Sequence, residues 1–583
     1  MKSPPEKPSA GGPGWGVFAP GLASFLADAP VVLAVLALFY AVLSMTRYWL
    51  APVNVHAQIS LAPSALPRYA MYSLLRIAIS YLISLFVAIL AGYSAAYSAR
   101  VERIMIPVLD TLQSIPVLSF LPPVMLAMVA LFPARQLGIE LGSILLIFTG
   151  QVWNMAFSFY ASLKSIPREM HEVAEVYGWS PWQKFTQMEL PFATIGLVWN
   201  SMMSVAGAWF FLMACEMFVL NDRDLRLPGL GSYLQTAANA GDTRAIAWGV
   251  GVMVGVIVLI DQLVWRPVIA WAEKFKFEQV EAAEISRSPV LDWLRHSRVL
   301  RSFSSYLTRP AAERLSLHFA RKQSGEARPT RPSSWRKWIR RTLFVTALAG
   351  VVFAVVKMCA LLLGLEAAEM RSIFSGAGAT FLRVEFSLVL AGLWTIPVGI
   401  WIGLRPKLSA IAQPLVQMAA SIPATALFPV ILLVLVRLGR GLGIGSIALL
   451  LLGTQWYILF NVIAGAMALP TDLREVCDVF HFASYEKWRD FLLPGIFPFL
   501  VTGFVTASGG AWNASIVAEY FHFRGQTFST LGLGAVISQA SDQNNFRVVL
   551  AATIVMAAMV VTINRLLWRR LYGLASTRFK LET

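Results

Sequence analysis

The sequence has few charged residues, and this shortage indicates the class of protein. Only 14% of its 583 residues are Asp, Glu, Lys or Arg, whereas 57% are hydrophobic and the mean hydropathy is +0.63. Ordinary soluble domains carry about 25% charged residues. Hydrophobic tracts of roughly 17 to 25 residues recur, long enough to cross a bilayer core as helices. We therefore expect an all-α polytopic membrane protein.

Residues for metal, nucleotide and disulfide chemistry are also scarce. The three cysteines are too few and too scattered for a disulfide framework or a zinc site. His171 and Glu172 begin like the zinc motif H-E-x-x-H, but Glu175 stands where the second histidine is needed. No Gly-Lys pair occurs, so the chain has no G-x4-G-K-[ST] loop for ATP. We expect no catalytic residue, no metal and no cofactor bound by this chain.

Twelve hydrophobic tracts predict membrane-spanning helices, six before a basic segment and six after it. The expected spans are residues 29–49, 70–97, 104–132, 139–163, 190–220 and 245–270, then 342–364, 378–403, 409–437, 442–467, 492–519 and 547–569. The corresponding domains are a mobile tail at 1–27, a first six-helix bundle at 28–272, a linker at 273–340, a second six-helix bundle at 341–573 and a tail at 574–583. The Pro- and Gly-rich first residues lack the apolar core of a cleavable signal peptide.

The placement of positive charge predicts the orientation of the chain. Between Lys274 and Arg341 there are 16 Lys or Arg residues against 6 Asp or Glu. Basic loops stay on the cytoplasmic side of a membrane, and an even number of spans per half brings both termini to the side of the linker. We expect the linker and both termini in the cytoplasm. No recognition module accompanies these charges, so nucleic acid is not an expected partner.

The two halves repeat each other. SIPVLSFLPP at 114–123 returns as SIPATALFPV at 421–430, an offset of 307, and after a shorter loop the offset becomes 303. At this second offset, for example, Trp209 aligns with Trp512 and Glu216 with Glu519. Repeats with an even number of spans have the same orientation. We therefore expect two homologous six-helix bundles related by a pseudo-twofold axis along the membrane normal, with any solute path at their interface.

A charged stretch interrupts the apolar tracts of each half. The first runs HEVAEVYGWSPWQKFTQMELP at 171–191 and the second REVCDVFHFASYEKWRDFLLP at 474–494. Each separates a Glu from a Pro by 19 residues. The matching positions are Glu172, Ala174, Gly178 and Pro191 in the first copy and Glu475, Cys477, His481 and Pro494 in the second. A histidine adopts a left-handed turn less readily than a glycine, so the sequence determines the geometry of the second copy less firmly than that of the first.

These stretches resemble the EAA loop, E-A-A-x3-G-x9-I-x-L-P, of ABC-importer permeases. Segments such as LLRIAISYLISLFVAILAGYSA at 74–95, LPGLGSYL at 227–234 and DQLVWRP at 261–267 resemble the permeases of nitrate, sulfonate, taurine and bicarbonate importers. The resemblance implies a fused permease of a bacterial inner membrane that moves a small anion by alternating access. It also implies two cytoplasmic ATPase subunits, which would bind ATP and Mg, and a solute-binding protein. The charged stretches would then be coupling helices.

Eight residues are candidates for the solute path or its gate. The Ser-Ile-Pro motifs should break helices, and a broken helix inside a membrane lines a cavity or is buried in protein. Glu216 and Glu519 end apolar spans, where a carboxylate either serves transport or bonds to a nearby loop or Arg. Arg76 and Arg383 are expected to extend toward the membrane surface, with anion attraction as the alternative. The eight candidates are Ser114, Pro116, Trp209, Glu216, Ser421, Pro423, Trp512 and Glu519.

Two other classes of protein are weighed against this interpretation. A secondary transporter with two six-helix halves would use an ion gradient, and its usual signature is ionisable residues in the middle of the spans. The spans here are expected to be nearly free of such residues except at their ends. An intramembrane enzyme would need a paired catalytic constellation, which the sequence does not show. The linker is either a tether or an amphipathic surface segment.

Overall fold

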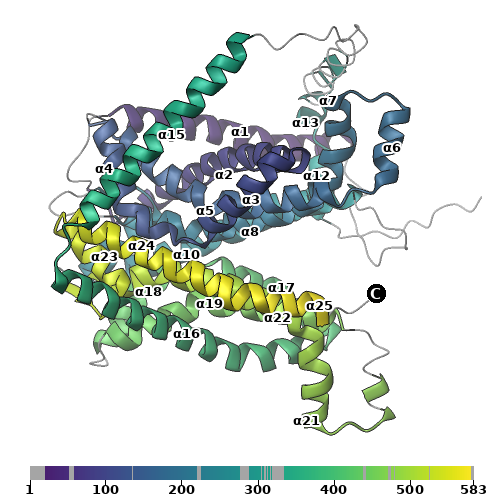
Figure 1. Cartoon of the computed structure of the whole chain (residues 1–583). Helices are drawn as coiled ribbons and strands as arrows, with labels where there is room; N and C mark the ends of the chain where they lie inside the picture. The colour runs from purple at the N-terminus through teal and green to yellow at the C-terminus, as the bar shows by residue number, and fades with distance from the viewer. Residues whose placement is uncertain are drawn as a thin grey trace, which may run out of the picture.

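The computed structural model shows a bundle of long helices (Figure 1). It describes residues 20–51, 58–133, 135–218, 225–275, 288–303, 305–306, 310, 313–314, 317, 334–437, 442–469, 475–477, 479–523 and 526–578. The expected tails and much of the expected linker lie outside these residues. Helix α1 already begins at Pro20, inside the segment expected as the N-terminal tail.

The first half contains helices of very different length. Its long helices are α1 (Pro20–Leu50), α2 (Leu66–Tyr97), α5 (Leu137–Lys164), α8 (Leu190–Glu216) and α10 (Thr243–Ile260). The shorter ones are η1 (Pro63–Ala65), α3 (Ala99–Ser114), η2 (Val117–Phe120), α4 (Leu121–Leu131), α6 (Arg168–Val176), α7 (Pro181–Lys184), η3 (Phe185–Glu189), α9 (Leu230–Ala240), η4 (Asp261–Trp265), α11 (Arg266–Ala272) and η5 (Glu273–Phe275). Two short linker helices follow, α12 (Pro289–Arg295) and α13 (Arg298–Phe303).

The second half repeats this order. Its helices are α15 (Ser334–Leu362), α16 (Ala367–Gly403), α17 (Pro406–Ser421), α18 (Ala424–Arg437), α19 (Leu442–Met467), α21 (Ser484–Glu486), η7 (Lys487–Leu492), α22 (Leu493–Glu519), α23 (Leu533–Asp542), α24 (Phe546–Ile563), η8 (Asn564–Trp568) and α25 (Arg569–Arg578). A hairpin of β1 (Tyr520–Phe523) and β2 (Gln526–Ser529) is inserted after α22, with Tyr520 opposite Ser529 in antiparallel register.

The segment 104–132, expected as a span that its Ser-Ile-Pro motif breaks, consists of two helices. Helices α3 and α4 meet at 85°. The break falls at the Ser-Ile-Pro motif, as predicted, because α3 ends at Ser114 and Pro116 has extended backbone. In the second half, α17 ends at Ser421 and α18 begins at Ala424. Proline lacks an N–H and disfavours helical backbone in the residue before it, which accounts for both breaks.

Both halves contain helices that are long and apolar enough to cross a membrane. Among the residues that the structure describes, nine helices are long and apolar enough to cross a membrane, and the bent α3–α4 pair makes a tenth if counted as one span. Their apolar side chains face outward as well as inward, as in Leu33 of α1 and Leu393 of α16, which are 68% and 69% exposed. The architecture is therefore that of an all-α polytopic membrane protein.

Small residues bring the long helices close together at matching places in the two halves. A Cβ added to Gly92 of α2 would lie 2.9 Å from Phe159 of α5. A Cβ added to Gly399 of α16 would lie 2.7 Å from Val462 of α19. Close approach through glycine is a common means of packing helices in a membrane, where no hydrophobic force drives them together.

The halves exchange contacts through their broken helices. Helix α18 of the second half packs against α8 and α9 of the first, whereas η2 of the first half packs against α22 of the second. Helices α6 and α21 both project from one end of the bundle, and α25 ends there as well (Figure 1). The linker reaches α1, because Ser297 Oγ donates to Asp28 Oδ1 at 2.6 Å. We call this end the α6 end, and the end that carries α9 and α23 the α9 end.

Candidate functional site

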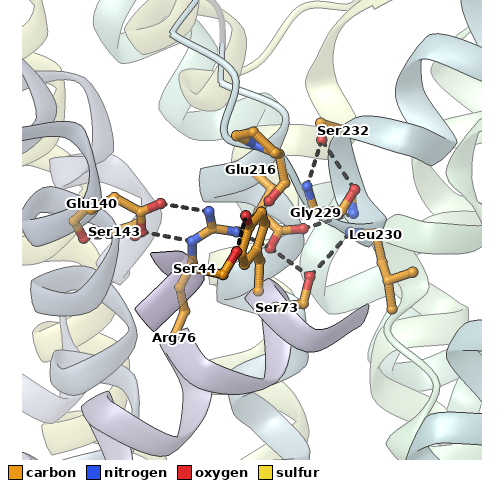
Figure 2. A network of polar contacts seen from close by, with 12 residues as sticks. Ser44, Ser73, Arg76, Glu140, Ser143, Glu216, Gly229, Leu230 and Ser232 are labelled. Atoms are coloured by element: carbon orange, nitrogen blue, oxygen red, sulfur yellow. Dashed lines mark hydrogen bonds and ion pairs between the residues drawn. The ribbon is translucent and has the colours of Figure 1, made fainter. Parts of the chain in front are cut away.

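A buried ion cluster connects three helices near the α9 end of the first half (Figure 2). Arg76 of α2 lies between Glu140 of α5 and Glu216, the last residue of α8. Its Nη2 is 2.6 Å from Glu140 Oε1, and its Nη1 is 2.7 Å from Glu216 Oε1. All three side chains are fully buried. Buried charges need partners and additional hydrogen bonds, so these contacts fix the relative positions of α2, α5 and α8.

Glu216 also holds the beginning of α9. Its Oε2 accepts a hydrogen bond from the backbone N–H of Gly231 at 2.7 Å, and its Oε1 accepts one from Ser73 Oγ at 2.7 Å. Ser73 Oγ in turn accepts from the N–H of Leu230 at 3.0 Å. A carboxylate at a helix N-terminus satisfies backbone donors that have no partner in the helix. A Cβ at Gly229 would lie 2.2 Å from this carboxylate, so the position requires glycine.

The second half builds the same arrangement with one carboxylate fewer. Arg383 forms an ion pair with Glu519, which also accepts from Thr380 Oγ1 at 2.8 Å and from the N–H of Gly534 at 2.8 Å. At the offset of 303, Gly443 occupies the position of Glu140. The other guanidinium nitrogen of Arg383 donates to Leu531 O at 2.9 Å and to Thr530 Oγ1 at 3.4 Å. The two halves are therefore similar in geometry but different in charge.

These clusters correct one expectation about the arginines. Arg76 does not extend to the membrane surface, because its side chain is fully buried, and that of Arg383 is only 11% exposed. Their partners explain the difference, since a guanidinium needs no water when carboxylates and carbonyls occupy its donors. Glu216 and Glu519 follow the alternative of a helix-end carboxylate bonded to a loop and an Arg. Sequence reasoning missed Glu140, whose one signal was its place near the start of a span.

Helix α6 presents an exposed face at its end of the bundle. Glu172 is exposed, whereas Ala174 is buried with 3% of its surface accessible. Gly178 has φ +60 and ends the helix, because its N–H donates to Glu175 O at 3.0 Å while the N–H of Trp179 donates to Ala174 O at 2.9 Å. This pair of bonds is a Schellman motif. The π-helical turn η3 then leads into α8, with Pro191 in its first turn.

The second copy keeps this geometry despite its different residues. His481 has φ +52, so it adopts the left-handed conformation of Gly178. The N–H of Phe482 donates to Cys477 O at 3.0 Å, as that of Trp179 does to Ala174 O. Cys477 is 5% exposed and Glu475 is exposed. Pro494 lies in the first turn of α22, after the π-helical turn η7.

Apolar side chains are exposed beside the glutamate in both copies. In α6 these are Val173, Val176 and Tyr177, with exposed fractions of 49%, 84% and 73%. At the offset of 303 they correspond to Val476, Val479 and Phe480, with exposed fractions of 44%, 73% and 71%. Exposed apolar residues gathered beside a charge are typical of surfaces that bind another protein or a membrane. We call each set, together with its glutamate, a docking face.

A cavity of about 210 Å³ lies between the two halves. Its first-half wall comes from α8, α10 and η4, and its second-half wall from α17, α19 and α22. Trp209 is among its lining residues, together with Trp265, Trp456 and Asp261. Trp512, at the matching position of α22, is 1% exposed and does not belong to the described lining.

The other path candidates lie apart from this cavity. Pro116 and Pro423 are buried at the helix breaks, and the side chains of Ser114 and Ser421 lie outside the described part of the chain. Glu216 and Glu519 are enclosed in the ion clusters. Among the eight candidates, the structure thus places Trp209 at the cavity. Sequence reasoning also missed Asp261 and Tyr457, because an interface between two repeats leaves no pattern within either one.

Comparison with known proteins identifies the family that has this architecture. The family of binding-protein-dependent transport system inner membrane components matches residues 64–264 and again residues 395–574. The two matches cover more than half of the chain and coincide with the two repeats. The chain therefore belongs to this family, as a fused and duplicated member. It is a multi-pass membrane protein and a transport component.

Individual relatives resemble roughly a third of the chain. The bicarbonate transport system permease protein CmpB of Synechococcus elongatus is 27% identical over 187 residues, which are 32% of this chain and 64% of that protein. The nitrate import permease protein NrtB of Leptolyngbya laminosa is 24% identical, covering 34% and 67% of the two chains. The taurine transport system permease protein TauC of Escherichia coli is 26% identical, covering 33% and 68%.

Proposed function

We propose that the chain is the complete permease of an ATP-driven importer, in which one polypeptide provides both transmembrane bundles. The two docking faces carry this proposal, because they repeat the same exposed glutamate and apolar residues at the same end of the molecule (Figure 1). Duplicated faces fit two copies of an ABC ATPase subunit. Closure of the ATPases on ATP would then move the bundles relative to each other and open the interface alternately to each side.

The contacts within α6 support this use. Its Schellman motif and the buried Ala174 hold the helix against the bundle, so a push on the docking face is passed to α8. An exposed carboxylate can form a charge-assisted hydrogen bond with a cationic group of a partner. In the second copy Cys477 and His481 preserve the backbone geometry but change the surface. We therefore expect the two docking faces to make similar but not identical contacts with the ATPase subunits.

Orientation, partners and cargo follow from the same proposal. The basic linker favours the α6 end on the cytoplasmic side of a bacterial inner membrane, with both termini there. A solute-binding protein would dock at the α9 end. The relatives are named for bicarbonate, nitrate and taurine, each of which is an anion or carries an anionic group. We accordingly propose a small solute with an anionic group.

Simultaneous replacement of both exposed glutamates tests the coupling role. We expect Glu172→Ala with Glu475→Ala to reduce copurification of the ATPase from native membranes by at least tenfold. Each single variant should retain partial binding, because one docking face remains. The matched control is Glu366→Ala, an exposed acid at the opposite end of the bundle. A double variant that still binds its ATPase and imports solute at the normal rate would refute the coupling assignment.

One residue favours a second candidate, a transporter driven by an ion gradient. Glu385 lies in the middle of α16, an exception in spans that were expected to be nearly free of ionisable residues outside their ends. Among the described residues, its Oε1 has no hydrogen-bond partner. A carboxylate in a membrane span is a functional candidate for ion coupling. Uptake that a protonophore abolishes, and that continues without any ATPase, would favour this candidate. Loss of uptake in Glu385→Gln would then assign the ion coupling to this carboxylate.

A further inference from the structure

The cavity between the halves is lined by aromatic rings and not by cations. Trp209 and Trp265 come from the first half, and Trp456, Tyr457 and Phe460 from the second. Two methionines of α8 add further apolar surface. Among the described residues that line the cavity, none is Lys or Arg.

The hydroxyl and amide donors of the cavity are partly used within the protein. Asn461 Nδ2 donates to Tyr457 O at 2.8 Å, and the hydroxyls of Thr502 and Thr506 donate to carbonyls of their own helix at 2.9 Å each. The two threonine oxygens and the second N–H of the Asn461 amide are left for a ligand. A bare anion such as nitrate gives up its hydration on entry and needs cations or N–H donors in return. The described lining supplies no Lys or Arg for this exchange.

Asp261 supplies the charge of the site. Its carboxylate is 21% exposed and lies 3.4 Å from Nε of Arg266, whose side chain is 50% exposed. Gln262 Nε2 donates to the carboxylate at 3.1 Å. Both contacts fall on Oδ2, so Oδ1 can accept a hydrogen bond from a ligand. Aromatic faces combined with a carboxylate attract an ammonium group, through cation–π interactions and a charge-assisted hydrogen bond.

The two repeats differ at two polar positions of this cavity. At the offset of 303, Asn564 stands in place of Asp261, and Asn154 in place of Tyr457. Asn154 lies in a separate open groove of the first half, where its neighbours include amides and hydroxyls such as Gln113, Ser158 and Asn200. The carboxylate that would bind an ammonium group thus comes from the first repeat.

We propose that the cavity binds the cationic amino group and the apolar body of a small organic solute. This inference rests on the proposed function, because it takes the cavity as part of the solute path. The cargo is then an organic acid that also carries an amino group, and not an inorganic anion such as nitrate or bicarbonate. The cavity has about 210 Å³. A cavity of about 150 Å³ holds benzene, so this one has room for a ring with one short substituent.

Competition binding to the full-length chain in lipid nanodiscs tests the proposal. The probe is radiolabelled benzylamine, with benzoate and nitrate as competitors, so that charge sign is compared on the same ring. We expect saturable binding of benzylamine, competition by benzoate that is at least tenfold weaker than by unlabelled benzylamine, and no competition by nitrate. Equal competition by benzoate, or displacement by nitrate, would overturn the proposal.

Substitutions of residues that line the cavity test whether benzylamine binds there. Asp261→Asn keeps the shape of the side chain and should weaken benzylamine binding at least tenfold, whereas the control Glu366→Gln removes an exposed carboxylate outside the cavity and should leave binding unchanged. Ala206→Phe should fill the cavity and abolish binding, and Thr506→Phe provides a second filling variant if the first does not fold. Unchanged binding in Asp261→Asn, or in both filling variants, would also overturn the proposal.

The benzylamine binding experiment and the ATPase copurification experiment can fail independently of each other. A chain that assembles with its ATPase but does not prefer benzylamine rejects the solute inference and leaves the permease function in place. A chain that binds benzylamine as expected but assembles with no ATPase rejects the coupling role and leaves the cavity assignment in place.

Discussion

At the scale of single residues, Arg76 and its two glutamate partners form the largest buried group of charged side chains among the described residues. Arg76 balances Glu140 and Glu216 at 2.6 and 2.7 Å, and none of the three is accessible to solvent. Removing one partner of a buried ion pair costs about 3–5 kcal/mol, because the other charge stays buried without compensation. We expect Arg76→Met to lower the thermal stability of the purified chain in detergent by an amount in this range, or to prevent its accumulation in the membrane.

The second half supplies a matched comparison for this prediction. Arg383 faces one glutamate, and Gly443 replaces the second carboxylate. We expect Arg383→Met to destabilise the chain less than Arg76→Met in the same melting experiment. Adding Glu140→Gln and Glu216→Gln to Arg76→Met should recover part of the loss. An equal loss of thermal stability in the two arginine variants would show that the charge difference between the halves does not affect stability.

The close packing of Gly229 against Glu216 leads to a separate prediction about stability. A Cβ there would lie 2.2 Å from the Glu216 carboxylate, which is held by Arg76, Ser73 and Gly231 and cannot move freely. We expect Gly229→Ala to cost about 1–3 kcal/mol, as overpacking does. Gly251 of α10 has no atom within 4 Å of such a Cβ, so Gly251→Ala should be neutral or slightly stabilising. Melting temperatures of the two variants, measured side by side, distinguish packing from a general effect of alanine.

At the scale of elements, His481 ends a helical turn in a conformation that suits glycine. Its φ of +52 matches the +60 of Gly178 at the equivalent position. A residue with a Cβ pays about 1–2 kcal/mol in this region, and glycine does not. We expect His481→Gly to raise stability by about 1 kcal/mol, and Gly178→His to lower it by a similar amount. Opposite or absent shifts in thermal melting would mean that the histidine side chain makes a compensating contact.

The same comparison shows what sequence patterns reveal about elements. The Ser-Ile-Pro motifs predicted two helix breaks correctly, because proline acts on its own backbone and on that of its neighbour. The size of the bend between α3 and α4, 85°, was not predicted, because hydropathy averages over a window and does not register an angle. The sequence left the geometry at His481 open, and the structure gives this residue the left-handed turn of Gly178, with the N–H of Phe482 bonded to Cys477 O.

At the scale of the whole molecule, the contacts between the halves predict that they can assemble without the covalent linker. Helix α18 packs against α8 and α9, and η2 packs against α22, so a broken helix of each half contacts the other half. We expect two coexpressed fragments, divided between Phe303 and Ser334, to copurify through a tag on either one. Independent purification of the fragments would show that the linker, and not the interface, keeps the bundles together. Expression of each fragment alone is the control for aggregation.

The sequence by itself determined the membrane class, the duplication and the family, because hydropathy, repeated spacing and short motifs are properties of neighbouring residues. It also located the charged stretches whose exposed faces carry the proposed coupling. Only the tertiary structure decided that Arg76 is buried between two glutamates, that His481 follows Gly178, and that Asp261 meets aromatic rings of the other half. The physical reason is that these properties depend on which distant residues share a low-dielectric interior, and the free energy of a charge or a turn is set by those neighbours.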